Sequence, residues 1–434
     1  MQKAFEEYIG QVCQQVRCKK AHEGIREELL SHLEDQAEAY TAVRGMDPEK
    51  AQEEAVRQMG DPVLVGGQLD AAHRPRPEWS VLTLAFLLMA GGIVLQVLVL
   101  SGSRFQQELD WMAYGIPVGA VALLIIYFLD YTMLAKMPLL AFLGIAGVCF
   151  LLLLRFKGAH GLITPYVSYI ALLFVPAFCG ILYSQKGKKY TGVLVCILFM
   201  AVPAVICMAA PNYTTLAIVF ASCVILLLAA VVKNWFCGKK LILVLMLAIP
   251  VAVFAFAYIF SSTGMFMLER FIHLFDTSGS FFMSKVKDTL AGAQWVGMTY
   301  AWPFDESFAL SMSLWQGDLM LTAIIGLYGW CAGLAVIVGI ALLVWRLFAA
   351  ACRQKNTLGF FVCLSVAILI AFQSIVFIMV NTGLMMVGVL SLPLMLGGGT
   401  NLAVNMCLVG LFLSAYKYNG IVSDKIIMKR KMIA

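Results

Sequence analysis

Long apolar runs, separated by short polar connections, dominate the sequence from residue 80 onward. The runs are continuous and not alternating, which is typical of membrane helices and not of barrel strands. Each is about twenty residues long, the length that a helix needs to cross a bilayer. There are ten of them: 80–100, 111–129, 137–154, 162–183, 190–209, 213–232, 241–260, 319–345, 358–380 and 397–416. The sequence therefore predicts an all-α, polytopic membrane protein with about ten transmembrane helices.

The first 78 residues have the pattern of a small soluble helical domain. Leucines recur at helical spacing among charged residues in IREELLSHLEDQAEAY. A later helix is predicted with Asp47 as its N-cap and Gly60 just past its end. The stretch RPRPE at 74–78 indicates a stiff linker. We therefore expect a helical head, residues 1–78, and a membrane body, residues 79–434.

Charge separates the same two parts and predicts their sidedness. Residues 1–79 contain 10 Lys/Arg and 15 Asp/Glu, a net charge of −5, and because the whole chain carries +6, the remainder carries +11. The N-terminus also lacks the basic-then-apolar order of a signal peptide. Basic residues gather in alternate loops, so the positive-inside rule places the head and the C-terminus in the cytoplasm, with Arg155 and Lys157 as exceptions. The loops on the head's side contain Lys136; Lys186, Lys188 and Lys189; Lys233, Lys239 and Lys240; Arg346, Arg353 and Lys355; and Lys425, Lys429, Arg430 and Lys431.

Composition argues against several classes of function. The chain is 61% hydrophobic with a mean hydropathy of +0.87, and it has no basic stripe on a soluble face, so nucleic-acid binding is not expected. The 12 cysteines show neither CxxC nor metal-ligand spacing, which argues against zinc and structural disulfides. The middles of the predicted spans contain almost no ionisable residue, which disfavours ion-coupled transport.

The loop 261–318 is the one long segment predicted outside the cytoplasm, and loops of this length are usually functional or disordered. Its aromatic residues can anchor at the bilayer surface or stack on sugars. Its cations Arg270, Lys285 and Lys287 can hold a diphosphate. Asp318 ends the loop directly before an apolar run. An Asp at this position is either a helix N-cap or a general base, and it can be both.

The C-terminal part interrupts its apolar runs with Gly, Pro and Asn at fixed places. Such residues let a helix break at membrane depth, but only where the freed backbone groups face protein or a wet cavity. We therefore predict a re-entrant turn between the last two helices. The interrupting residues are Asn381, Gly383, Pro393, Gly397, Gly398, Gly399, Thr400 and Asn405.

At these residues the chain resembles the SEDS family, of the FtsW, RodA and SpoVE type. The family's late signature appears here as Asn381-Thr382-Gly383, Pro393, Gly398-Gly399-Thr400-Asn401 and Val404-Asn405-Met406. Asp318 before Leu319-Met320-Leu321 matches the family's Asp before an apolar helix start. The resemblance covers about residues 80–418, and the head is similar to a small "permease prefix" domain with a regulatory role.

The resemblance implies a peptidoglycan glycosyltransferase in the bacterial cytoplasmic membrane. Asp318 would then be the base that activates one molecule of lipid II toward another, with Arg270, Lys285 and Lys287 binding the undecaprenyl-linked substrate. A divalent cation, Mg²⁺ or Mn²⁺, can assist the leaving diphosphate, although no metal ligands are assigned. The expected protein partner is a class B penicillin-binding protein, a transpeptidase.

Two alternatives stay open at this point. The family has His-Thr before its Asp, whereas this chain has Gln316-Gly317. This departure motivates a non-catalytic sensor or scaffold for cell-wall synthesis. The other alternative is a carrier of lipid-linked precursors.

Overall fold

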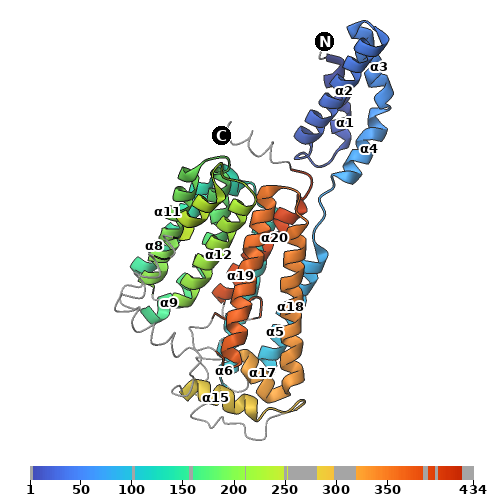
Figure 1. The fold of residues 1–434 in the computed structure, drawn as a ribbon. Helices are drawn as coiled ribbons and strands as arrows, with labels where there is room; N and C mark the ends of the chain where they lie inside the picture. Colours follow the sequence, from blue (N-terminus) through green and yellow to red (C-terminus); the bar gives the residue numbers. More distant parts are fainter. Residues whose placement is uncertain are drawn as a thin grey trace.

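The computed structural model describes residues 3–99, 103–155, 160–210, 212–248, 252, 281–297, 319–384, 390–395 and 399–422. Within these residues all regular secondary structure is helical, and the helices form a membrane bundle with a smaller group of helices set above one end (Figure 1). The prediction of an all-α polytopic membrane protein is confirmed.

Four helices make up the head: α1 (Lys3–Gln15), α2 (His22–Arg44), α3 (Pro48–Met59) and α4 (Pro62–Ala72). Pro48 and Pro62 each begin a helix after an Asp, where the missing N–H of proline costs no intrahelical hydrogen bond. Gly45 ends α2 in the left-handed conformation that glycine adopts without strain. The Asp70 carboxylate accepts a hydrogen bond from Arg17 N at 2.9 Å, which ties the end of α4 to the loop after α1.

The described part of the body contains helices long enough to cross a membrane and shorter apolar helices. Seven described spans are long and apolar enough to cross a membrane, and Trp79–Leu95 and Tyr114–Phe128 are shorter apolar helices. The predicted span 241–260 lies mostly outside the described residues. The body helices are α5 (Trp79–Val99), α6 (Ser103–Phe128), α7 (Met133–Lys136), α8 (Pro138–Arg155), α9 (His160–Leu172), α10 (Phe174–Ser184), α11 (Tyr190–Ala209), α12 (Tyr213–Val232), α15 (Phe281–Ala291), α17 (Met320–Tyr328), α18 (Trp330–Cys352), α19 (Thr357–Asn381) and α20 (Gly399–Lys417).

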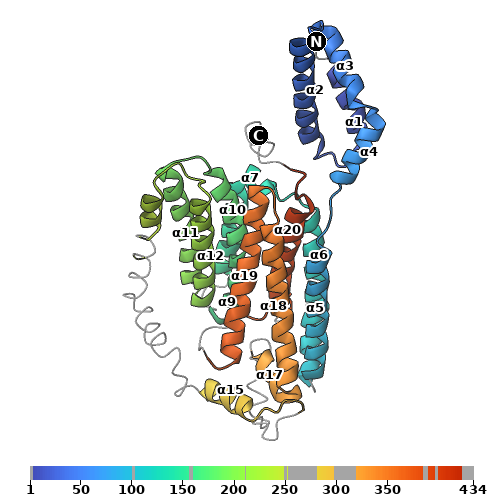
Figure 2. The same cartoon turned by 45° about the vertical axis from the view of Figure 1, so that its right-hand side comes forward.

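One predicted span is wrong as a single helix. The apolar run 319–345 forms two helices, α17 and α18, which meet at Gly329. Gly329 has φ +89°, and a Cβ there would lie 2.6 Å from the carbonyl oxygen of Trp295. The break is held from outside the run, because Trp330 N donates to Gln294 O at 2.9 Å. α17 is therefore a short helix below the end of the bundle that is remote from the head (Figure 2).

A second span is bent at Leu173, which lies between α9 and α10. Pro176 causes this bend, because a proline ring clashes with the carbonyl four residues earlier and cannot donate a hydrogen bond to it. Small residues on α6 allow close packing against α20. A Cβ on Gly115 would lie 2.9 Å from Gly399 Cα on α20, so the two helices approach closely there.

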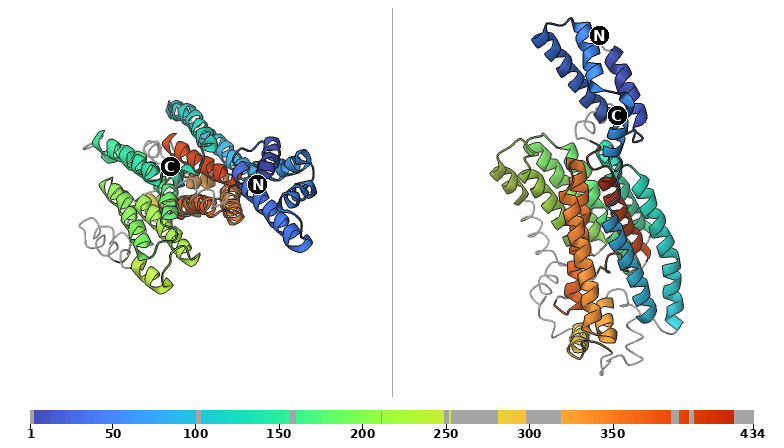
Figure 3. Two further views of the ribbon diagram at one scale, coloured as in Figure 1. Left: turned by 90° about the horizontal axis from the view of Figure 1, so that it is seen from above. Right: turned by 90° about the vertical axis from the view of Figure 1, so that its right-hand side faces the viewer.

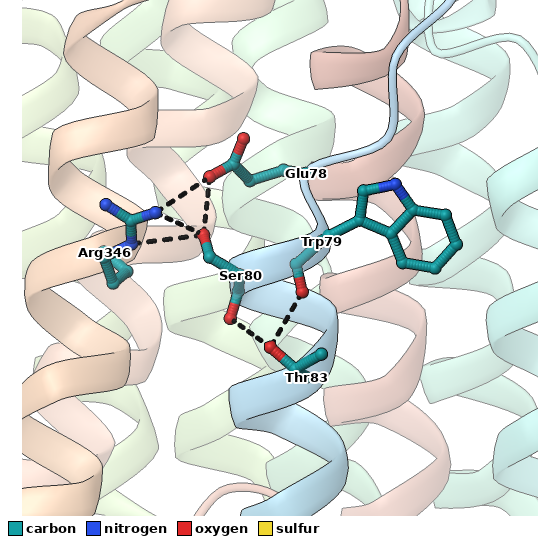
Figure 4. Close-up of polar contacts among 5 residues, drawn as sticks. All are labelled: Glu78, Trp79, Ser80, Thr83 and Arg346. Atoms are coloured by element: carbon teal, nitrogen blue, oxygen red, sulfur yellow. Dashed lines mark hydrogen bonds and ion pairs between the residues drawn. The ribbon is translucent and has the colours of Figure 1, made fainter.

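The linker from the head enters the body at a polar junction between α5 and α18 (Figure 4). Arg346 Nη2 lies 3.5 Å from Glu78 Oε1 and donates to Ser80 Oγ at 2.7 Å. Ser80 Oγ in turn donates to Glu78 Oε1 at 2.6 Å. The described chain thus enters the body at the end nearest the head, and α20 also ends there (Figures 2 and 3).

Candidate functional site

A buried asparagine holds the first turn of α17. Asn381, the last residue of α19, is fully buried. Its Oδ1 accepts a hydrogen bond from Thr322 N at 3.1 Å, and its backbone carbonyl accepts one from Thr322 Oγ1 at 2.8 Å. The first N–H groups of a helix have no partner within that helix. Asn381 therefore caps α17 from a different helix and fixes where α17 begins.

Helix α15 packs across the same point. Val286 of α15, Leu319 before α17 and Val380 of α19 belong to one buried hydrophobic cluster, together with Met283. The cluster joins three elements that are far apart in the sequence, and Figures 1 and 2 both draw α15 beside α17 at the end remote from the head.

Lys287 reaches this junction from α15. Gly383 adopts φ +71°, and a Cβ added there would lie 3.2 Å from Lys287 Cγ, so the lysine stem covers the backbone of this buried glycine. The Lys287 side chain is exposed. No carboxylate in the described part of the chain lies within ion-pair distance of it. An ammonium group is thus presented next to the start of α17 and remains available to an anionic ligand.

The segment 390–395, between α19 and α20, is not helical and is buried. Ser391 N donates to Tyr169 Oη at 2.9 Å, and Tyr169 Oη donates to Ser391 Oγ at 3.1 Å. The carbonyl of Leu392 accepts from Asn401 Nδ2 at 3.4 Å. Leu394, directly after Pro393, has φ +66°, a conformation rare for residues other than glycine. The predicted break between the last two helices is present, and side chains of α9 and α20 satisfy two of the freed backbone groups.

Three buried amide side chains form a hydrogen-bonded series that ends at Asn401, which contacts this segment. Asn405 of α20 donates to the carbonyl of Asn401 at 3.1 Å and contacts Gln373 of α19 through hydrogen bonds at 3.4 and 3.5 Å. All three side chains are at most 1% exposed. Each is hydrogen-bonded, as buried polar groups must be if they are not to destabilise the protein.

The predicted site residues divide into three groups. Asn381, Gly383 and Lys287 meet at the start of α17. Pro393 and Asn405 lie in the buried segment and its support, and Gly399 and Thr400 begin α20, where Gly399 allows the close approach to α6. Leu392 and Met395 pack in one hydrophobic cluster with Met320 and Leu321 of α17, so the first two groups adjoin. Asp318, Arg270 and Gly398 lie outside the described residues, as does the side chain of Lys285.

Three residues that position the site were not predicted from the sequence: Thr322, Tyr169 and Gln373. Gln373 carried a signal that could have been used, since it is an amide in the middle of the long apolar helix α19. Tyr169 carried none, because a tyrosine in a membrane helix is ordinarily read as a packing or interfacial residue. In the described part of the chain, no three His, Cys, Asp or Glu side chains are grouped as a metal site would require.

The chain is similar to known proteins both in part of its sequence and in its fold. No family model matches the chain. A probable peptidoglycan glycosyltransferase FtsW from Halomonas elongata is 26% identical over 237 residues, which are 53% of this chain and 57% of the relative. The chain thus matches little more than half the length of that curated relative.

Solved structures show the same fold across more of the chain. A chain of a peptidoglycan synthase complex superposes with a TM-score of 0.58 and 17% identity, covering 79% of this chain and 98% of that one. The rod shape determining protein RodA of Thermus thermophilus gives 0.52 at 14% identity, and a single-residue variant of it gives 0.54 at 15%, both with the same coverage. The chain therefore has the fold of these solved proteins, and 237 of its residues are similar to a probable peptidoglycan glycosyltransferase FtsW.

Proposed function

We propose that this protein polymerises lipid II on the outer face of the bacterial cytoplasmic membrane, with its head in the cytoplasm. The observation that carries the proposal is the junction of α15, α17 and α19. There the capped start of α17, two residues after Asp318 in the sequence, adjoins Lys287, which has no carboxylate partner among the described residues. A glycosyl transfer with a diphosphate leaving group needs a base and a cation close together.

The proposed reaction is a single displacement with inversion. Asp318 takes the proton from the 4-hydroxyl of the acceptor sugar, and the oxygen forms a bond to the anomeric carbon of the donor. The bond from that carbon to undecaprenyl diphosphate breaks, and the diphosphate leaves with both electrons. Lys287, with Arg270 and Lys285, offsets the negative charge that develops on the leaving group.

Asn381 has a positioning role in this scheme. A general base is effective only within hydrogen-bond reach of the proton that it takes. Leu319, the next residue after Asp318, is buried in the cluster with α15 and α19. The Asn381–Thr322 hydrogen bonds hold the turn that follows. We expect these contacts to hold the Asp318 carboxylate in position.

Purified protein in nanodiscs with lipid II tests the proposal. The parent should form glycan chains that a gel resolves, and Asp318→Asn, which keeps size and capping ability, should form none. Asp288→Asn is the matched control, because Asp288 is an exposed carboxylate on α15. Polymerisation by Asp318→Asn at the parental rate would remove Asp318 as the base.

A non-catalytic sensor or scaffold is the second candidate, and the Gln316-Gly317 departure from the family pattern favours it. In that case lipid II would bind but no polymer would form from any variant. In either case we propose a class B penicillin-binding protein as partner, because one similar fold comes from a peptidoglycan synthase complex. Co-purification of such a transpeptidase with the tagged chain checks this partner.

A further inference from the structure

In the described part of the chain, Lys20 of the head contacts the body at the end of the bundle opposite the candidate site. Lys20 lies in the loop between α1 and α2. Its Nζ is 2.9 Å from Asp130 Oδ2 and 3.7 Å from the centroid of the Tyr418 ring. A carboxylate beside an aromatic face is a good binding site for an ammonium group. The Lys20 and Asp130 side chains are only 26% and 19% exposed, so the pair is partly shielded from water.

Ring stacking and hydrogen bonds connect this ammonium site to the first turn of α19. Tyr418 stacks on Tyr131, with ring centroids 6.4 Å apart. The Tyr131 hydroxyl accepts a hydrogen bond from the side chain of Asn356. Asn356 is the N-cap of α19, where its Oδ1 accepts from Gly359 N. We call Asp130, Tyr131, Tyr418 and Asn356 the base site.

The base site and the candidate site are joined by one uninterrupted helix. α19 has 25 residues, which at about 1.5 Å per residue spans about 37 Å. Its first turn is capped by Asn356 of the base site, and its last residue is Asn381, which caps α17. A rigid helix fixed at both ends transmits a displacement of one end to the other when both ends have alternative arrangements.

We propose that the base site is a docking site for Lys20 of the head, and that docking stabilises the arrangement of α19 that holds the start of α17. The head is then a control domain. Its release from Asp130 and Tyr418 frees the N-cap of α19 and loosens the Asn381–Thr322 contact. Only the control of catalysis by the head rests on the proposed function. Docking of Lys20 and its effect on α17 do not require catalysis.

Hydrogen–deuterium exchange of the full chain in nanodiscs tests both steps without an activity assay. Lys20→Met should speed exchange in 129–136 and 416–422, since losing an ion pair and a cation–π contact changes the docked-to-undocked ratio by about tenfold. Exchange in 319–326 should rise several-fold as well. Lys20→Arg should resemble the parent. Lys19→Met is the matched control, because Lys19 is the exposed neighbour in the same turn, and it should change neither region.

Each result decides one step. Unchanged exchange at the base site in Lys20→Met would overturn the docking proposal. Faster exchange at the base site with unchanged exchange in 319–326 would overturn the link through α19. A protein that passes both tests but forms no glycan with lipid II would contradict the proposed function and leave the docking intact.

Discussion

The two ends of α19 are built alike and used differently. At each end a buried asparagine caps a helix, Asn356 for α19 itself and Asn381 for α17. At each end a lysine lies beside the cap. Lys20 is paired with Asp130, whereas Lys287 has no carboxylate partner among the described residues. An asparagine cap and a lysine thus form an internal ion-paired contact at one end, and at the other end they leave the lysine available to a ligand.

The largest effect is expected from Asn381→Leu. It keeps the branching at Cγ but leaves Thr322 N without its acceptor, and an unsatisfied buried donor costs about 1–3 kcal/mol. Lipid II polymerisation should fall at least about tenfold, and amide exchange in the first turn of α17 should rise. Asn356→Ala is the comparison at the other end, where loss of an N-cap costs about 1 kcal/mol. Equal losses of polymerisation in both variants would contradict the distinction between the ends.

Lys287→Met should act on substrate binding. Removing a cation that meets a diphosphate should raise KM for lipid II about tenfold, a typical loss for one charge-assisted hydrogen bond. Lys287→Arg should keep most of the affinity. Lys20→Met, the equivalent change at the base site, should raise KM less than Lys287→Met does, because it removes no group that meets the substrate. A KM in Lys287→Met equal to that of the parent would remove this lysine from the site.

The start of α17 shows how far the sequence could predict the site. Asn381 and Gly383 stand out as polar and flexible residues at the end of an apolar run, and the break before α20 follows from the Gly and Pro there. The partner of Asn381 could not be inferred, because Thr322 is 59 positions away and is an ordinary residue for a helix. Gly329 looked like one more small residue in an apolar run, since its positive φ is required by the backbone of residues 294 and 295.

Gly383→Ala should have a smaller effect. An alanine in the left-handed region costs about 1–2 kcal/mol, and its Cβ would press on the stem of Lys287. Gly45→Ala in the head has a similar φ of +60° but nothing within 4 Å of the added Cβ. Both variants should therefore lose similar stability in thermal unfolding, while only Gly383→Ala should raise KM for lipid II. A rise in both would assign the effect to stability alone.

The smallest effect concerns pH at the base site. Burial of Asp130 disfavours its ionised form, but hydrogen bonds from Lys20 and from Thr132 outweigh burial and lower the pKa of the Asp130 carboxyl below its ordinary value. A lowered pKa contributes docking stability that is fully present above about pH 4 and is lost as the pH falls through the lowered pKa. Among the described residues, Lys417 also faces this contact, with its Nζ 5.5 Å from the centroid of the Tyr418 ring.

Head release, followed by amide exchange at the base site after correction for the intrinsic rate, should therefore be constant from pH 5 to 8 and should increase below about pH 4. Asp130→Asn removes the titrating group and should give a flat profile. An equal acid response in Asp130→Asn would show that another group controls docking.

The central claim is that substrate binds where α15, α17 and α19 meet. Photo-crosslinking with a lipid-linked disaccharide diphosphate probe, mapped by mass spectrometry on the full chain in nanodiscs, tests it directly and does not depend on turnover. We expect adducts in 283–290, 319–322 and 381–384 that lipid II displaces and that Lys287→Met reduces. Displaceable adducts confined to the end of the bundle near the head, or absent from these three segments, would contradict it.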